Sequence, residues 1–217
     1  MPTVTCICPT KDTRQAFIPL AIECFLQQDF TDSEMLVVFE GFLPATITNP
    51  RIRYIRVPKM DIGTKRNWCN EYAKGRVIAH WDDDDWSCPT RLTEQVSRII
   101  SQRKAVTGYF SMNFFDVRSR RVSQIITGSG HLPYAMGTSL CYLKSFWEKH
   151  PFPEGHTGED IFLVNEARRL SQLDCANGLG KMVVRRHAEN TCQASEDELM
   201  SMQDLPQGFR NAIHLNL

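Results

Sequence analysis

The sequence predicts an α/β fold, with a mostly parallel central sheet, flanking helices, a Rossmann-like first half and a smaller mixed second half. Short apolar runs alternate with helical patterns through the first half, which is typical of parallel strands joined by covering helices. In the second half, two apolar runs are separated by a short charged segment, which favours a hairpin.

Apolar runs predict four strands in the first half, at Thr3–Cys8, Met35–Phe39, Ile52–Val57 and Val77–Trp81. Helical spacing predicts the segments between them. The first helix carries a stripe made of Phe17, Leu20, Ala21, Cys24 and Phe25, the second covers Gly63–Ala73, and the third runs from Pro89 to Ile100. This alternation of strands and helices is the basis of the fold prediction.

The second half begins with the predicted hairpin, whose strands are Ala105–Val117 and Val122–Ile126. Further strands are expected at Ser139–Leu143 and Met182–Arg186. A helix is expected over Glu159–Leu170, and a polar terminal helix over Glu196–Gln203.

Length and composition indicate one neutral domain without a membrane anchor. The chain has 217 residues, with 25 basic and 25 acidic side chains, so no overall charge attracts it to nucleic acid or an anionic membrane. It has neither a signal-peptide pattern nor an apolar run of the ~20 residues that a membrane span needs, and we therefore expect a cytoplasmic protein. Its eight cysteines lack zinc-site spacing, and Cys6 and Cys8 are expected to be buried strand thiols.

The strongest chemical signal is the run of four acids from Asp82 to Asp85, which directly follows the fourth strand between Trp81 and Trp86. Acidic runs are commonly solvated surfaces. Here, however, adjacent carboxylates repel one another unless a cation lies among them, and the flanking tryptophans argue against a hydrated loop. Ligands of open α/β sheets bind beyond the carboxyl ends of strands, so we expect Mg²⁺ or Mn²⁺ at this edge.

Three further motifs accompany the acids. Lys65 and Arg66 occur at the start of a helix, where cations are unfavourable without an anion, so they indicate a bound phosphate, although surface cations are the simpler alternative. Glu159 and Asp160 begin another helix, as either a structural cap or a general base. His187 follows the last predicted strand and by itself indicates little.

Together these segments resemble the family-two inverting glycosyltransferases of GT-A fold, which depend on nucleotide-sugars. The resemblance extends from Thr3 to about Gln193. It is carried in order by CICPTKDTRQAFIPLAIECFLQQDF, IGTKRNWCNEYAKGRVIAHWDDDDW, GTSLCYLKSFWEKHPFPEGHTGED and RRHAENTCQ. It implies a nucleotide-binding half over 1–104, an acceptor half over 105–194 and a C-terminal tail over 195–217.

The resemblance also implies roles for individual residues. Asp160 would be the catalytic base, beside Glu159. Residues around the nucleotide and its diphosphate would be Pro9, Thr10, Asp12, Arg14, Glu40, Lys65, Arg66, Asn67, Asp82 and Asp83. Metal ligands would come from Asp82, Asp84, Asp85 and His187, with Asp84 foremost. The chain departs from the family at Phe39-Glu40-Gly41-Phe42, where relatives commonly carry paired aspartates, Gly and Ser. The contact to the nucleobase, and hence the identity of the nucleotide, therefore stays open.

The expected reaction transfers a sugar from a nucleotide-sugar, with UDP as the expected nucleotide, to an acceptor hydroxyl with inversion and a divalent cation. A saccharide is the default acceptor, with Tyr134, His131 and Met136 as candidate lining residues, while protein and DNA stay open. Two other classes remain. A nucleotidyltransferase would release pyrophosphate, but PTKDTRQAF is not its usual Gly-rich loop. A non-catalytic nucleotide-sugar binding module would not need the intact acids.

Overall fold

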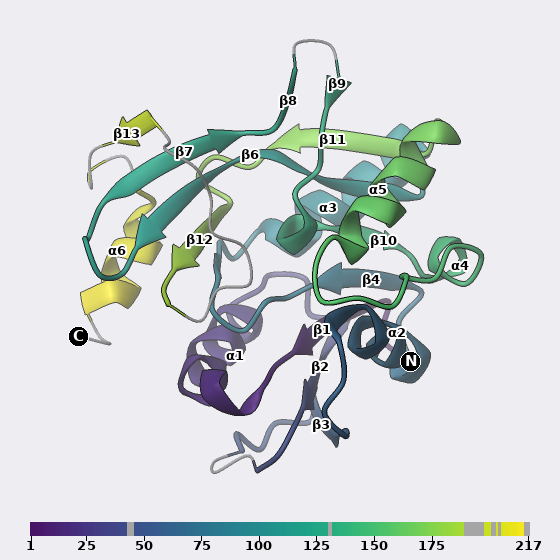
Figure 1. Cartoon of the computed structure of the whole chain (residues 1–217), viewed down its shortest axis with the longest axis horizontal. Helices are drawn as coiled ribbons and strands as arrows, with labels where there is room; N and C mark the ends of the chain where they lie inside the picture. The colour runs from purple at the N-terminus through teal and green to yellow at the C-terminus, as the bar shows by residue number, and fades with distance from the viewer. Residues whose placement is uncertain (43–45, 130–131, 189–197, 201–202, 204, 215–217) are drawn as a thin grey trace.

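One large sheet runs through the chain, with helices on both of its faces (Figure 1). The structure, a computed structural model, describes residues 1–42, 46–129, 132–188, 198–200, 203 and 205–214. The strands are β1 (Val4–Pro9), β2 (Ser33–Phe39), β3 (Ile52–Arg56), β4 (Val77–His80), β5 (Trp86–Ser87), β6 (Val106–Asp116), β7 (Val122–Ile126), β8 (Gly128–Ser129), β9 (Leu132–Pro133), β10 (Cys141–Leu143), β11 (Leu173–Asn177), β12 (Met182–Arg186) and β13 (Glu198–Met200). The helices are α1 (Ile18–Leu26), α2 (Ile62–Tyr72), α3 (Arg91–Gln102), α4 (Lys144–Trp147), α5 (Glu159–Arg169) and α6 (Gln207–His214), with 3-10 helices η1 (Asp12–Phe17) and η2 (Gly137–Ser139).

The sheet changes character between its two halves. Strands β4, β1, β2 and β3 are neighbours in that order and all parallel. Strand β10 then lies antiparallel between β4 and the long β6. β6 pairs in parallel with β11 and β12 and antiparallel with β7. The predicted α/β fold, with a parallel first half and a mixed second half, is confirmed.

An apolar layer on each face of the sheet explains why the central strands are continuous apolar runs in the sequence. Cys6 and Cys8 face the layer that contains α1 and α3, whereas Ile7 faces the layer that contains α2 and α5. A strand covered on both faces has no solvated side, so its sequence does not alternate. Both cysteines are fully buried free thiols, as expected. Among the described residues, no helix has the length and apolarity required to span a bilayer.

Most predicted elements occur within two or three residues of their expected bounds, but the C-terminal region differs. The helix expected over 196–203 is wrong in its described part, because Glu198–Met200 forms β13 and pairs antiparallel with β7. The edge of β7 offers unpaired backbone groups, and satisfying them favours a strand. The helix of this region begins later, at Gln207. The sequence analysis also missed β11, which pairs with β6.

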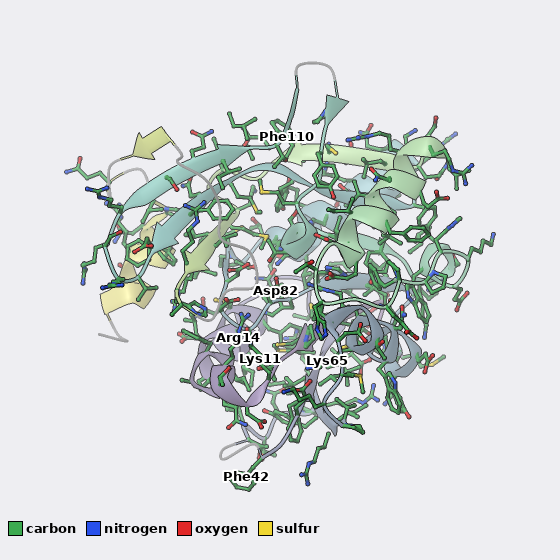
Figure 2. All side chains as sticks on the ribbon, in the orientation of Figure 1. Lys11, Arg14, Phe42, Lys65, Asp82 and Phe110 are labelled. Atoms are coloured by element: carbon green, nitrogen blue, oxygen red, sulfur yellow. The ribbon has the colours of Figure 1, made fainter. Side chains whose placement is uncertain are left out.

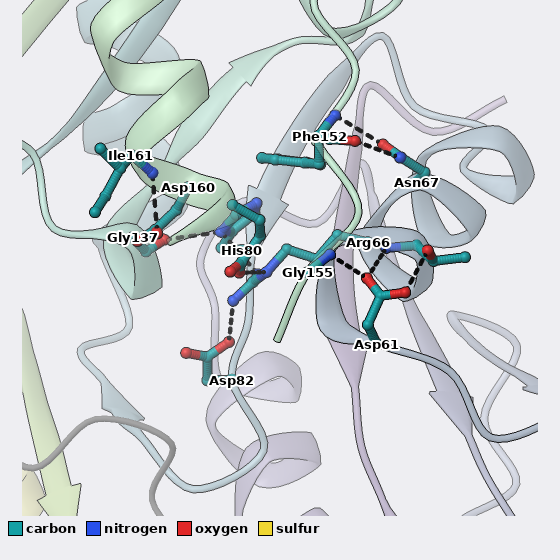
Figure 3. Close-up of polar contacts among 12 residues, drawn as sticks. Asp61, Arg66, Asn67, His80, Asp82, Gly137, Phe152, Gly155, Asp160 and Ile161 are labelled. Atoms are coloured by element: carbon teal, nitrogen blue, oxygen red, sulfur yellow. Dashed lines mark hydrogen bonds and ion pairs between the residues drawn. The ribbon is translucent and has the colours of Figure 1, made fainter. Parts of the chain in front are cut away.

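Asp61 caps α2 and anchors the segment that leads to α5. Its carboxylate accepts hydrogen bonds from the backbone amide and hydroxyl of Thr64, at 2.9 and 2.7 Å, and from the amide of Gly155 at 2.8 Å (Figure 3). These bonds, first that of Gly155, lower the pKa of Asp61. The cap therefore joins two segments that lie 94 positions apart in the sequence.

We expect Asp61→Ala to lower the free energy of unfolding at pH 7 by about 0.5–2 kcal/mol, the usual cost of losing such a cap. The folded-state pKa lies below the unfolded value, so the contribution is present above about pH 4 and is lost as the pH falls further. Urea unfolding at pH 7 and pH 3 measures this. Asp61→Asn is the matched control, because asparagine also caps helices, and an equal loss in both variants would contradict the assignment.

Candidate active site

The acid run lies at the carboxyl end of β4, near the centre of the molecule, where Figure 2 shows Asp82 above Arg14 and Lys65. Trp81 and Trp86 on either side are buried, as the sequence indicated. Asp83, Asp84 and Asp85 are buried as well, whereas the side chain of Asp82 is 25% exposed. The run is therefore not a solvated surface.

Two of the buried acids are held by hydroxyl groups. Asp83 accepts a hydrogen bond of 2.5 Å from Thr10, and burial raises its pKa to about 7 despite the nearby Arg14. Asp85 accepts bonds from the Thr138 hydroxyl at 2.5 Å and the Arg185 amide at 3.2 Å. Burial, followed by repulsion from Asp84, raises the pKa of Asp85 well above its usual range. Both oxygens of Asp85 therefore accept hydrogen bonds from protein groups.

Asp84 contacts both an arginine and a histidine. His187 Nε2 lies 2.9 Å from Asp84 Oδ2, and Arg14 forms ion pairs with both Asp83 and Asp84. Burial would raise the pKa of Asp84, but the hydrogen bond with His187 and the charge of Arg14 lower it. Phe17 stacks on His187 with ring centroids 4.5 Å apart. The structure thus brings together three of the predicted residues, from η1, the acid run and the end of β12.

The cations of α2 have carboxylate partners within this chain. Lys65 is buried and pairs with Glu40 at 2.5 Å and the Thr10 carbonyl at 3.0 Å. Arg66 is buried against Asp82 and Glu159. Side-chain carboxylates of Glu40 and Glu159 are therefore the anions beside these cations in the structure, and a bound phosphate stays a prediction.

Asn67 does not reach the site. Its carboxamide donates to the Phe152 carbonyl at 2.8 Å and accepts from the Trp147 indole and the Phe152 amide, both at 2.9 Å (Figure 3). These bonds hold the end of α4 and the segment that follows it. The expected nucleotide contact of Asn67 is not what this placement indicates.

Glu159 and Asp160 begin α5 in different surroundings. Glu159 is buried and its Oε1 accepts from Arg66 Nε at 2.9 Å, while burial raises its pKa against the opposing effect of Arg66. Asp160 is partly exposed and accepts the amide of Ile161 at 3.0 Å. Gly158 precedes them with φ 79°, a left-handed conformation that favours glycine. The two acids therefore have distinct roles in the structure.

A cavity of about 380 Å³ joins these groups. Its lining includes Pro9, Arg14 and the acid run as well as His156 to Asp160. Arg66 and Arg186 also line it, and the apolar part of its wall includes Phe114, Ile125, Met136 and Val184. A separate cavity beside it is lined by Asp12, Glu40, Gly41, Arg56, Val57, Pro58 and Lys59.

The sequence analysis missed the polar residues beneath this cavity. His80 is fully buried and contacts Arg66 and the Gly137 carbonyl, while Tyr142 bonds Asn70. A histidine inside the apolar run VIAHW was an available signal, whereas nothing local distinguishes Gly137. Of the candidate acceptor residues, Met136 lines the cavity, Tyr134 does not, and His131 lies outside the described residues. Within the described ranges, no three His, Cys, Asp or Glu side chains form a preformed metal centre.

The family model of glycosyl transferase family 2 matches residues 5–157, more than half of the chain. The chain belongs to glycosyl transferase family 2. This glycosyltransferase assignment favours neither the nucleotidyltransferase nor the binding module that the sequence left open. No curated protein matches the sequence.

Solved structures of TarS from S. aureus share the fold. TarS 1-349 in complex with UDP-GlcNAc superposes with a TM-score of 0.65 at 16% identity, covering 90% of this chain and 62% of that chain. The crystal structure of TarS superposes with a TM-score of 0.62 at 15% identity, and the match covers 86% of this chain and 37% of the TarS chain. This family-2 chain thus spans less than two thirds of the TarS chains, and the likeness establishes the GT-A type of fold alone.

Gly137 provides a test of the site. A Cβ atom built on Gly137 would overlap the carboxylate of Asp160. We expect Gly137→Ala to displace Asp160 and reduce sugar transfer on the order of 100-fold, as misplacement of a reacting group by about 1 Å can do. Steady-state kinetics measures this, with thermal unfolding as the check on folding. Wild-type turnover in a folded variant would show that Asp160 need not lie where the structure has it.

Proposed function

We propose that this glycosyltransferase moves a sugar from a UDP-sugar to an acceptor hydroxyl with inversion, assisted by a divalent cation. The observation that carries the proposal is that the acid run and Asp160 line one and the same cavity. A transferase must neutralise a departing diphosphate and deprotonate an acceptor, and this cavity provides groups for both tasks. Residues 1–104 would then form the donor half and residues 105–194 the acceptor half.

The donor half offers places for a nucleoside diphosphate. Pro9, Thr10 and Arg14 follow β1 at the edge of the sheet where ligands of such folds bind. The separate cavity lined by Asp12 and Glu40 would take the nucleobase. Arg14, which lines the main cavity, would supply positive charge near the diphosphate. The UDP-GlcNAc complex of TarS, which has the same fold, supports UDP as the nucleotide.

The residues at Asp84 fit a divalent cation. An aspartate oxygen and an imidazole nitrogen 2.9 Å apart are suitable donors for Mn²⁺ or Mg²⁺, and few protein ligands leave positions for phosphate oxygens. Asp84 and His187 would hold the ion, with the partly exposed Asp82 beside them. When bound, the ion would neutralise charge on the departing diphosphate.

Asp160 would act as the base. Its carboxylate lines the cavity and, in the described structure, has no ion pair that would need to be broken. It would accept the proton of the acceptor hydroxyl while the acceptor oxygen bonds to the anomeric carbon and the bond from that carbon to the diphosphate breaks. Attack on the face opposite the leaving group inverts the anomeric centre.

The acceptor would lie against the wall formed by Phe114, Ile125 and Met136, next to Asp160. A saccharide fits this wall because a sugar ring has apolar faces as well as hydroxyl groups. We therefore retain a saccharide as the proposed acceptor. A screen of UDP-sugars with saccharide acceptors, with UDP and pyrophosphate both quantified, tests the reaction class, since a nucleotidyltransferase would release pyrophosphate.

Replacing the base should separate catalysis from donor binding. We expect Asp160→Asn to lower kcat by about 10²–10⁴-fold, the usual contribution of a general base. UDP affinity should stay within about threefold of wild type, because the base acts on the acceptor. Turnover assays and calorimetric UDP titration measure the two effects. Near-normal turnover would refute the assignment of Asp160.

Replacing a proposed metal ligand should weaken donor binding, which replacing the base should not. We expect Asp84→Ala to weaken UDP binding in the presence of Mn²⁺ by about tenfold or more, while binding without Mn²⁺ changes little. The matched control is Asp85→Asn, which alters a buried acid that faces Thr138 instead. It should retain Mn²⁺-dependent UDP binding. An identical loss in both variants would argue against Asp84 as a specific ligand.

A further inference from the structure

Arg66 lines the cavity and contacts acids from both of the segments that supply its carboxylates. Its Nε donates to Glu159 at 2.9 Å, one terminal nitrogen lies 2.8 Å from His80 Nδ1, and the other lies 3.4 Å from Asp82 (Figure 3). Glu159 immediately precedes the proposed base, and Asp82 belongs to the acid run. One buried side chain thus contacts Asp82 and Glu159, which lie 77 positions apart in the sequence.

A second route leads from Arg66 to Asp160 through His80. His80 Nδ1 lies 2.7 Å from the Gly137 carbonyl and 2.8 Å from an Arg66 terminal nitrogen. Because the guanidinium only donates and the carbonyl only accepts, this ring nitrogen hydrogen-bonds one of them at a time and is in packing contact with the other. Gly137 in turn packs so closely on the Asp160 carboxylate that no side chain would fit between them. His80 therefore influences where Asp160 can lie.

The charge of Arg66 is balanced by carboxylates of the same chain. All three of its guanidinium nitrogens face side chains of this chain, and Asp82 and Glu159 are both carboxylates. Withdrawing the guanidinium towards a diphosphate would leave the buried Glu159 without its cationic partner, which is costly in a protein interior. Arg66 is thus better placed to hold protein groups than to bind phosphate.

We propose that Arg66 is a positioning residue that, through Glu159 and His80, fixes the Asp160 carboxylate relative to the acid run, and is not a ligand of the diphosphate. This inference rests on the proposed role of Asp160 as base. It replaces the phosphate contact that the sequence indicated for Arg66.

The two roles predict opposite kinetics. If Arg66 positions the base, Arg66→Lys and Glu159→Gln should each lower kcat by about 10–100-fold, with donor KM and UDP affinity within about threefold of wild type. Glu159→Ala should be slower than Glu159→Gln, because glutamine keeps an acceptor for Arg66 Nε. If Arg66 instead binds the diphosphate, Arg66→Lys should chiefly weaken UDP affinity and raise donor KM, and the proposal is overturned.

The controls separate this inference from the proposed function. Arg98→Lys makes the same substitution in an arginine that pairs with Asp174, and it should leave kinetics unchanged. If Arg66→Lys fails to fold, His80→Asn is the second variant and should show the same loss in kcat with donor KM retained. Full kcat in folded Glu159→Gln and His80→Asn, with Asp160→Asn inactive, overturns the positioning role alone. An active Asp160→Asn overturns the proposed base as well.

Discussion

The structure of the site depends on burying several carboxylates at the end of one strand. Asp83, Asp84 and Asp85 are withdrawn from water, and a buried carboxylate needs a hydrogen bond, a cation or a proton. Those partners come from distant segments: Thr10 and Arg14 after β1, Thr138 in η2, and His187 after β12. Neutralising the acids therefore also draws the surrounding loops together, and the cavity is the space that these loops enclose.

Burial also gives the four acids different chemistry. Asp83 and Asp85 have raised pKa values and hydroxyl partners, so they serve mainly to hold the loops in place. Asp84 has a lowered pKa and an imidazole beside it, and Asp82 keeps contact with solvent. The four acids thus differ in burial and in bonding partners. A sequence of four identical letters cannot reveal this difference, because the partners lie far away in the chain.

Features set by the local sequence could be predicted, whereas features set by distant partners could not. The strands of the first half were predictable, since burial on both faces requires apolar runs such as those of β1 and β4. Strand β11 was not, because LDCAN is too polar to stand out without its partner β6. For Lys65 and Arg66 the sequence indicated a bound phosphate, whereas their carboxylate partners Glu40 and Glu159 could be identified only from the fold.

The Glu159–Asp160 pair shows how two neighbouring acids come to have different surroundings. Both lie in the first turn of α5, where the helix dipole favours the ionised form of a carboxylate. Glu159 faces inwards and is bound to Arg66, so taking up a proton there would break a buried ion pair. Asp160 lines the cavity, and among the described residues its carboxylate has the local bond to Ile161 and no ion pair. A base must be free to bond a substrate, and this difference from Glu159 is what supports the proposed role of Asp160.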